Sequence, residues 1–175
     1  MNNNFSYTDE DDKCYGLTGM VISLNVLEHD DMLQEITLDS ENGDSITFTP
    51  DFYFYSNPRF SAKIAWNEML KQYQTLTGLI VGNILCRYQV KRGRPITSSL
   101  RDEMRALVVE EGRDLCQLED DEISMVFDKT LDFMENVYCN SSVHRLACAL
   151  ADTIKKRRTL SGHEVRDELQ ILRRY

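Results

Sequence analysis

The sequence lacks several features that would place a chain in a familiar class. No stretch of its 175 residues is apolar over the length of a membrane-spanning helix, and its first residues, MNNNFSYTDEDD, are polar and acidic, unlike a signal peptide. It contains no glycine-rich phosphate-binding loop, no internal repeat and no low-complexity segment. We therefore expect a cytoplasmic protein without membrane contact, folded as one domain over residues 1–175, with residues 1–8 as a flexible tail.

Residues that bind metals are also scarce. The three histidines, His29, His144 and His163, lie far apart in the sequence, and no two of them form a His-x-x-x-His pair. The five cysteines include no Cys-x-x-Cys pair, and several fall on predicted apolar helix faces. We expect the thiols to be reduced and buried, and we expect neither a metal ion nor a cofactor.

Basic side chains are nearly missing from the first third of the chain. Residues 1–58 carry twelve acidic and one basic side chain, a net charge of −11, whereas residues 59–175 carry seventeen acidic and nineteen basic ones, a net charge of +2. A chain with a net charge of −9 repels nucleic acid as a whole, although a local basic patch can still bind it.

Helical periodicity is what the sequence does contain. Apolar residues recur at helical spacing in residues 9–28, 57–90, 99–112 and 120–138, and in two helices within residues 141–172. Residues 20–26 also alternate as in a strand, but the acidic run after Thr8 is typical of a helix start. Asn42-Gly43 between two β-prone runs predicts a β-hairpin over residues 33–49. We expect a mainly α fold of five or six helices with this hairpin.

The end of the chain carries the clearest local signals. Lys155–Arg158 lie where cations stabilise the C-terminal end of a helix. Ser161 and Glu164 then form a Ser-x-x-Glu capping box, and Leu160 and Val165 are placed as a hydrophobic staple. The pattern predicts a helix, a sharp turn and a second helix.

This helix pair, LACALADTIKKRRTLSGHEVRDEL, resembles the C-terminal pair of the FtsH-type ATP-dependent zinc metalloprotease domain. Weaker similarities follow in the same order along residues 13–172, including Thr75–Leu85, Ile96–Gly112 and Asp120–Asn136. The resemblance implies an FtsH-protease-like domain over residues 9–175, an array of five or six helices with one small β-hairpin. The ATPase module and membrane helices of the family have no counterpart here.

The same resemblance implies that the zinc site is degenerate. In the family a His-Glu-x-x-His motif supplies two zinc ligands and the general base. These positions correspond to Gly16, Leu17 and Met20, and the third ligand, an aspartate, falls near Ser99. Glycine, leucine and methionine can perform none of these tasks. We therefore expect a non-enzymatic module that binds a protein partner or associates with itself.

Two alternatives stay open. The first is a metallopeptidase with a site that the sequence does not reveal. The second is a DNA-binding accessory protein, because Lys91-Arg92-Gly93-Arg94-Pro95 resembles the core of an AT-hook, which inserts arginines into the minor groove. The candidate patch comprises the basic residues of this loop and of the helix end, Lys91, Arg92, Arg94, Lys155, Lys156, Arg157 and Arg158.

Overall fold

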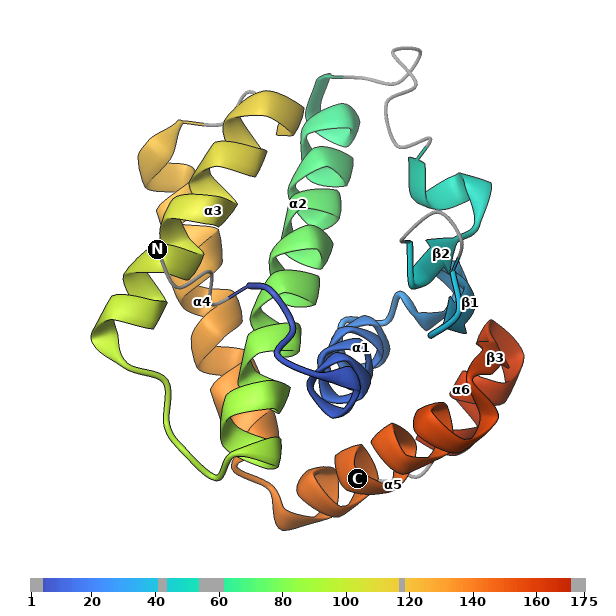
Figure 1. Cartoon of the computed structure of the whole chain (residues 1–175). Coiled ribbons are helices and arrows are strands. Elements are labelled where there is room, and N and C mark those ends of the chain that lie inside the picture. Colours follow the sequence, from blue (N-terminus) through green and yellow to red (C-terminus); the bar gives the residue numbers. More distant parts are fainter. Residues whose placement is uncertain (1–4, 41–43, 54–61, 117–118, 171–175) are drawn as a thin grey trace.

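The computed structural model describes residues 5–40, 44–53, 62–116 and 119–170, and for residues 51, 53, 62–68 and 111–116 it describes the backbone alone. The described part contains six α-helices and three short strands, which confirms the predicted mainly α class. In Figure 1 the long helix α2 (Ala62–Leu85) runs between α1 (Glu10–Val26) and the pair α3 (Ser98–Cys116) and α4 (Asp120–Tyr138). Within these residues no helix combines the length and the apolar character needed to cross a membrane.

Helix α1 forms the centre of the fold. Most of its residues are buried, and they lie on every side of the helix rather than on one apolar face, as in a helix enclosed by the rest of the protein. The helix predicted over residues 9–28 is confirmed, and a strand over residues 20–26 is excluded. A Cβ atom on Gly82 would lie 2.5 Å from the Gly19 carbonyl oxygen, so α1 and α2 cross in backbone contact.

Helices α3 and α4 cover the other side of α2. The predicted apolar face of α4 is confirmed, because Ile123, Phe127, Leu131, Met134 and Tyr138 are all fully buried. At its C-terminal end α2 continues into a six-residue π-helix, η3 (Cys86–Lys91). The predicted helix over residues 57–90 is therefore an α-helix followed by a π-helix, and its residues 57–61 lie outside the described part.

Three short strands form an antiparallel sheet in the order β2-β1-β3. The predicted hairpin consists of β1 (Leu33–Thr37) and β2 (Ile46–Phe48), while its Asn42-Gly43 turn lies outside the described residues. Short 3-10 helices, η1 (Asp30–Met32) and η2 (Pro50–Tyr53), flank the hairpin. The sequence did not predict β3 (Thr159–Ser161), which extends the sheet by pairing with β1.

The C-terminal helix pair is confirmed as α5 (Ser141–Arg157) and α6 (Gly162–Leu169). Both halves of the capping box form, since the Glu164 amide donates to Ser161 Oγ at 3.4 Å and the Ser161 amide donates to Glu164 Oε2 at 2.8 Å. Leu160 and Val165 are buried, as the predicted staple requires. Strand β3 fills the turn between the helices, so it joins the pair to the hairpin.

Candidate functional site

An apolar cavity of about 230 Å³ lies where α1, α2, α3 and the N-terminal residues 5–7 meet. Its walls come from all four segments and comprise Phe5, Tyr7, Met20, Leu79, Ile80, Asn83, Ile84 and Leu107. Five of these eight side chains are aliphatic and two are aromatic. The polar groups of the wall are the Asn83 amide and the Tyr7 hydroxyl, which bond to each other because Asn83 Nδ2 donates to Tyr7 Oη at 2.8 Å. The cavity therefore suits an uncharged, apolar group.

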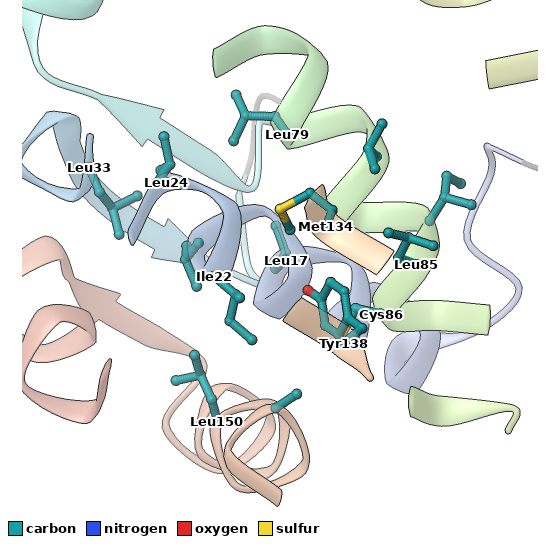
Figure 2. Close-up of a cluster of buried hydrophobic side chains, with 14 of the residues drawn as sticks. Leu17, Ile22, Leu24, Leu33, Leu79, Leu85, Cys86, Met134, Tyr138 and Leu150 are labelled. Atoms are coloured by element: carbon teal, nitrogen blue, oxygen red, sulfur yellow. The ribbon is translucent and has the colours of Figure 1, made fainter. Parts of the chain in front are cut away.

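Two of the positions that the resemblance assigns to a zinc site lie in or against the wall of this cavity. Met20 belongs to its wall. Gly16, one helical turn earlier on α1, is covered by two wall residues, because a Cβ atom there would lie 2.5 Å from Tyr7 Cε1 and 2.9 Å from Asn83 Nδ2. Leu17 instead belongs to the buried core with Tyr138 and Cys86 (Figure 2). The two positions that the resemblance assigns to histidines thus lie on the cavity side of α1, and the position that it assigns to the general base lies in the core.

The third position, Ser99, lies apart from the cavity wall. It is exposed in the first turn of α3, where its hydroxyl bonds to Glu103 Oε1 at 3.2 Å. The helix begins at Ser98, one residue before the predicted start at residue 99, and the Leu100 amide donates to Thr97 Oγ1 at 3.2 Å. The Thr97 hydroxyl thus accepts from an amide of the first turn, as an N-cap side chain does.

These residues do not fit a zinc ion. Zinc requires about three nitrogen, sulfur or carboxylate ligands, and Gly16, Leu17 and Met20 supply none that binds it well. A carboxylate at Leu17 would lie in the apolar core, and any side chain at Gly16 would collide with Tyr7. Across the described part of the chain, no group of three or more histidine, cysteine, aspartate or glutamate side chains could hold a metal ion.

Arg87 holds the N-terminal segment in place beside the cavity. Its side chain is 1% exposed and forms a 2.5 Å ion pair with Asp12, which is fully buried. The same guanidinium donates to the carbonyl oxygens of Ser6 at 2.7 Å and Phe5 at 3.5 Å, and it lies 4.9 Å from the centre of the Tyr7 ring. Residues 5–8, which the sequence assigns to a flexible tail, thus lie against the helices.

The Asp12 carboxylate accepts hydrogen bonds from several parts of the chain besides Arg87. It also accepts hydrogen bonds from the Thr8 amide at 3.1 Å and from Arg92 at 3.0 Å, and the Lys91 ammonium lies 3.6 Å away. Burial acts to raise the pKa of Asp12, but the hydrogen bonds from Arg87 and Thr8 outweigh it, so that the pKa is lowered. The carboxylate is therefore charged at neutral pH.

The candidate DNA-binding residues flank the acidic start of α1. From the loop side Lys91 pairs with Asp9 at 2.7 Å, and from the end of α5 Lys155 pairs with Asp11 at 2.5 Å. Arg158 pairs with both Glu10 and Asp39, Arg92 with Asp12, and Arg157 with Glu164. Arg94 and Lys156 are exposed. Most of these cations thus neutralise the carboxylates of the acidic N-terminal region, and a phosphate would have to compete with them.

The sequence did not reveal the residues that build the cavity wall and its support. Arg87 carried a signal, because a charged residue interrupts the apolar run Leu79–Val90 of a helix that is otherwise buried. Asn83 carried a weaker signal of the same kind. Phe5 and Tyr7 carried none, since two aromatic residues in a polar terminus are compatible with a disordered tail.

Comparison of the chain with protein-family models, with curated proteins and with solved structures finds no match.

Proposed function

We propose that this chain is a catalytically degenerate, FtsH-peptidase-like module that binds a protein partner and accepts an apolar side chain of that partner in the cavity. One observation carries the proposal. Of the two positions that resemble zinc-binding histidines, Met20 lines an apolar cavity and Gly16 lies against two of its wall residues, and neither carries a group that binds zinc well. A peptidase holds substrate side chains beside its catalytic group, and such a pocket can outlast the loss of the catalytic group.

The size of the cavity supports a single side chain as its occupant. Apolar cavities of about 150 Å³ already bind benzene. A cavity of about 230 Å³ therefore has room for the side chain of a leucine or a phenylalanine. Burying such a side chain fully stabilises a complex by roughly 1.5–3 kcal/mol. That range corresponds to about a ten- to 150-fold change in the dissociation constant.

The absence of catalysis is tested on the purified protein. We expect metal analysis to find no stoichiometric zinc and an unfolded substrate such as casein to stay intact. The reason is that both ligand positions and the base position have lost the required side chains. Tight zinc binding together with chelator-sensitive cleavage of casein would instead establish the metallopeptidase alternative.

Binding is tested with short fluorescent peptides that carry Leu, Phe or Asp at one central position. We expect the Leu and Phe peptides to bind more tightly than the Asp peptide. Ile80→Trp fills the cavity and should weaken their binding at least tenfold. Met125→Trp on α4 is the matched control, because Met125 is 54% exposed and lies outside the cavity wall. Equal binding by both variants would exclude the cavity as the site.

The DNA-binding alternative receives less support from the structure. Five of the seven candidate cations form ion pairs with carboxylates. Titration with A·T-rich duplex DNA at two salt concentrations separates it from the proposed function. Binding that weakens steeply with salt would favour this alternative, since released counterions drive such binding.

A further inference from the structure

We propose that the N-terminal segment Phe5-Ser6-Tyr7 occupies part of this site as a built-in ligand, and that the partner presents the same pattern, an aromatic residue, any residue, and a tyrosine. The inference rests on the function proposed above and specifies its partner. A partner segment of this kind would displace Phe5–Tyr7 and extend from the cavity along the surface of α1 and α2.

The backbone of the segment is recognised in the manner of a bound peptide. Arg87 donates to two successive carbonyl oxygens, those of Phe5 and Ser6. These contacts do not depend on the side chain at the middle position, and Ser6 itself is exposed. Two nitrogens of the Arg87 guanidinium donate to Asp12 Oδ2, and neither bond involves the segment. The guanidinium therefore stays in place when the segment leaves.

At the third position of the segment, the site recognises both the ring and the hydroxyl of a tyrosine. The amide of Asn83 donates to the Tyr7 hydroxyl at 2.8 Å, and the ring lies beside the Arg87 guanidinium. The missing side chain at Gly16 leaves the space that the Tyr7 ring fills, since a Cβ atom there would lie 2.5 Å from it. A phenylalanine would keep the ring contact but leave the Asn83 amide without its acceptor.

The first position is apolar and aromatic. Phe5 contributes to the cavity wall together with Ile80 and Leu107, which come from α2 and α3. When the segment leaves, its volume adds to that of the cavity, and the enlarged cavity is lined by the same aliphatic residues. The side chains of the segment therefore indicate which side chains of a partner the enlarged cavity would bind.

The segment can be exchanged without unfolding the domain. Residues 5–8 belong to no helix or strand, and Tyr7 is 38% exposed, so its outer edge already faces solvent. A tethered segment competes with any free peptide at an effective concentration of about a millimolar. The intact protein should for this reason bind the partner segment weakly, and weakening the internal segment should strengthen that binding.

The test uses the full chain and a fluorescent peptide with the sequence of residues 3–9, NNFSYTD. We expect the double variant Phe5→Ala, Tyr7→Ala to bind this peptide at least tenfold more tightly than the unaltered protein, measured by fluorescence anisotropy. A peptide with phenylalanine for tyrosine should bind several-fold more weakly. A peptide with alanine at both aromatic positions should show no binding.

A further substitution in the double variant locates the peptide. Gly16→Ala places a methyl group in the space of the tyrosine ring and should abolish binding. Gly78→Ala on α2 should leave binding unchanged, because the atom nearest to its added Cβ is the flexible end of Leu27 and not a residue of the segment. A cooperative melting transition in circular dichroism is the control that each variant is folded. A double variant that binds no more tightly than the unaltered protein, or that binds the alanine peptide equally, overturns the inference.

Two results separate this inference from the function on which it rests. If Ile80→Trp blocks the Leu and Phe peptides but NNFSYTD fails to bind the double variant, the cavity still binds apolar side chains and the pattern is wrong. If light scattering shows that the unaltered protein forms dimers and the double variant does not, the segment of one copy binds the site of a second copy of the chain. That result would also overturn the assignment of an external partner.

Discussion

The buried ion pair between Asp12 and Arg87 should be the most sensitive polar contact in the protein. Asp12 is 0% exposed and Arg87 is 1% exposed, so removal of the carboxylate leaves a guanidinium buried without its counter-charge. Breaking such a pair costs about 3–5 kcal/mol. For a chain of this length each kcal/mol lowers the melting temperature by roughly 2–4 °C. Asp12→Ala should therefore lower the melting temperature by about 6–20 °C.

A matched exposed pair supplies the control. Lys155 and Asp11 lie 2.5 Å apart with side chains that are 49% and 52% exposed. Solvent screens such pairs, so they contribute little to the free energy of unfolding. Lys155→Ala should consequently shift the melting temperature by less than about 4 °C. The distances are similar in the two pairs, so the comparison isolates the effect of burial.

The double variant Asp12→Leu, Arg87→Met tests the reason for the cost. It leaves no unpaired charge in the interior, so it should be more stable than Asp12→Leu alone. Urea unfolding followed by circular dichroism gives the free energies of unfolding of all variants. An Asp12→Ala variant that loses no more stability than Lys155→Ala would refute the reasoning, because it would show that water or another cation compensates the buried guanidinium.

Three further predictions concern acid, a cap and a helix crossing. The lowered pKa of Asp12 and that of Glu164, held at about 2 by hydrogen bonds from Ser161, mean that folding favours both carboxylates in their charged form. Their contribution to stability is complete above about pH 4.5 and is lost as the pH falls towards about 2, which acid titration of the unfolding free energy would detect. Ser161→Ala should cost about 0.5–2 kcal/mol through the lost N-cap, and an unchanged urea midpoint would contradict this. Gly82→Ala should cost about 1–3 kcal/mol or more, because its Cβ would lie 1.9 Å from the Ser23 hydroxyl and 2.5 Å from backbone. Gly78→Ala, which meets the flexible end of Leu27, should change the same unfolding free energy by less than about 1 kcal/mol.

Signals that act within one or two helical turns could be read from the sequence. The apolar face of α4 follows from its spacing, and the capping box of α6 follows from two residues three positions apart. The strands of the hairpin follow from β-prone runs around Asn42-Gly43. In each case the residues that decide the structure are neighbours in the chain. The absence of zinc-binding side chains at Gly16, Leu17 and Met20 could likewise be read directly, given the resemblance.

The cavity and its N-terminal wall depended on contacts between distant parts of the chain. Arg87 and Asp12 are 75 residues apart in the sequence, and no local pattern predicts their contact. Strand β3 forms because Leu160 comes to lie opposite Ile36, which turns a predicted helix-to-helix turn into part of a sheet. Pairing of the basic residues at the end of α5 with the acids of α1 likewise requires both helix ends to arrive at one place. The sequence by itself determined the helices and the strands of the hairpin, because hydrogen bonds and apolar spacing within a helix or hairpin decide these features. Only the tertiary structure decided which charges are neutralised, which residues enclose the cavity and that residues 5–7 close one side of it, because these features depend on how the helices pack.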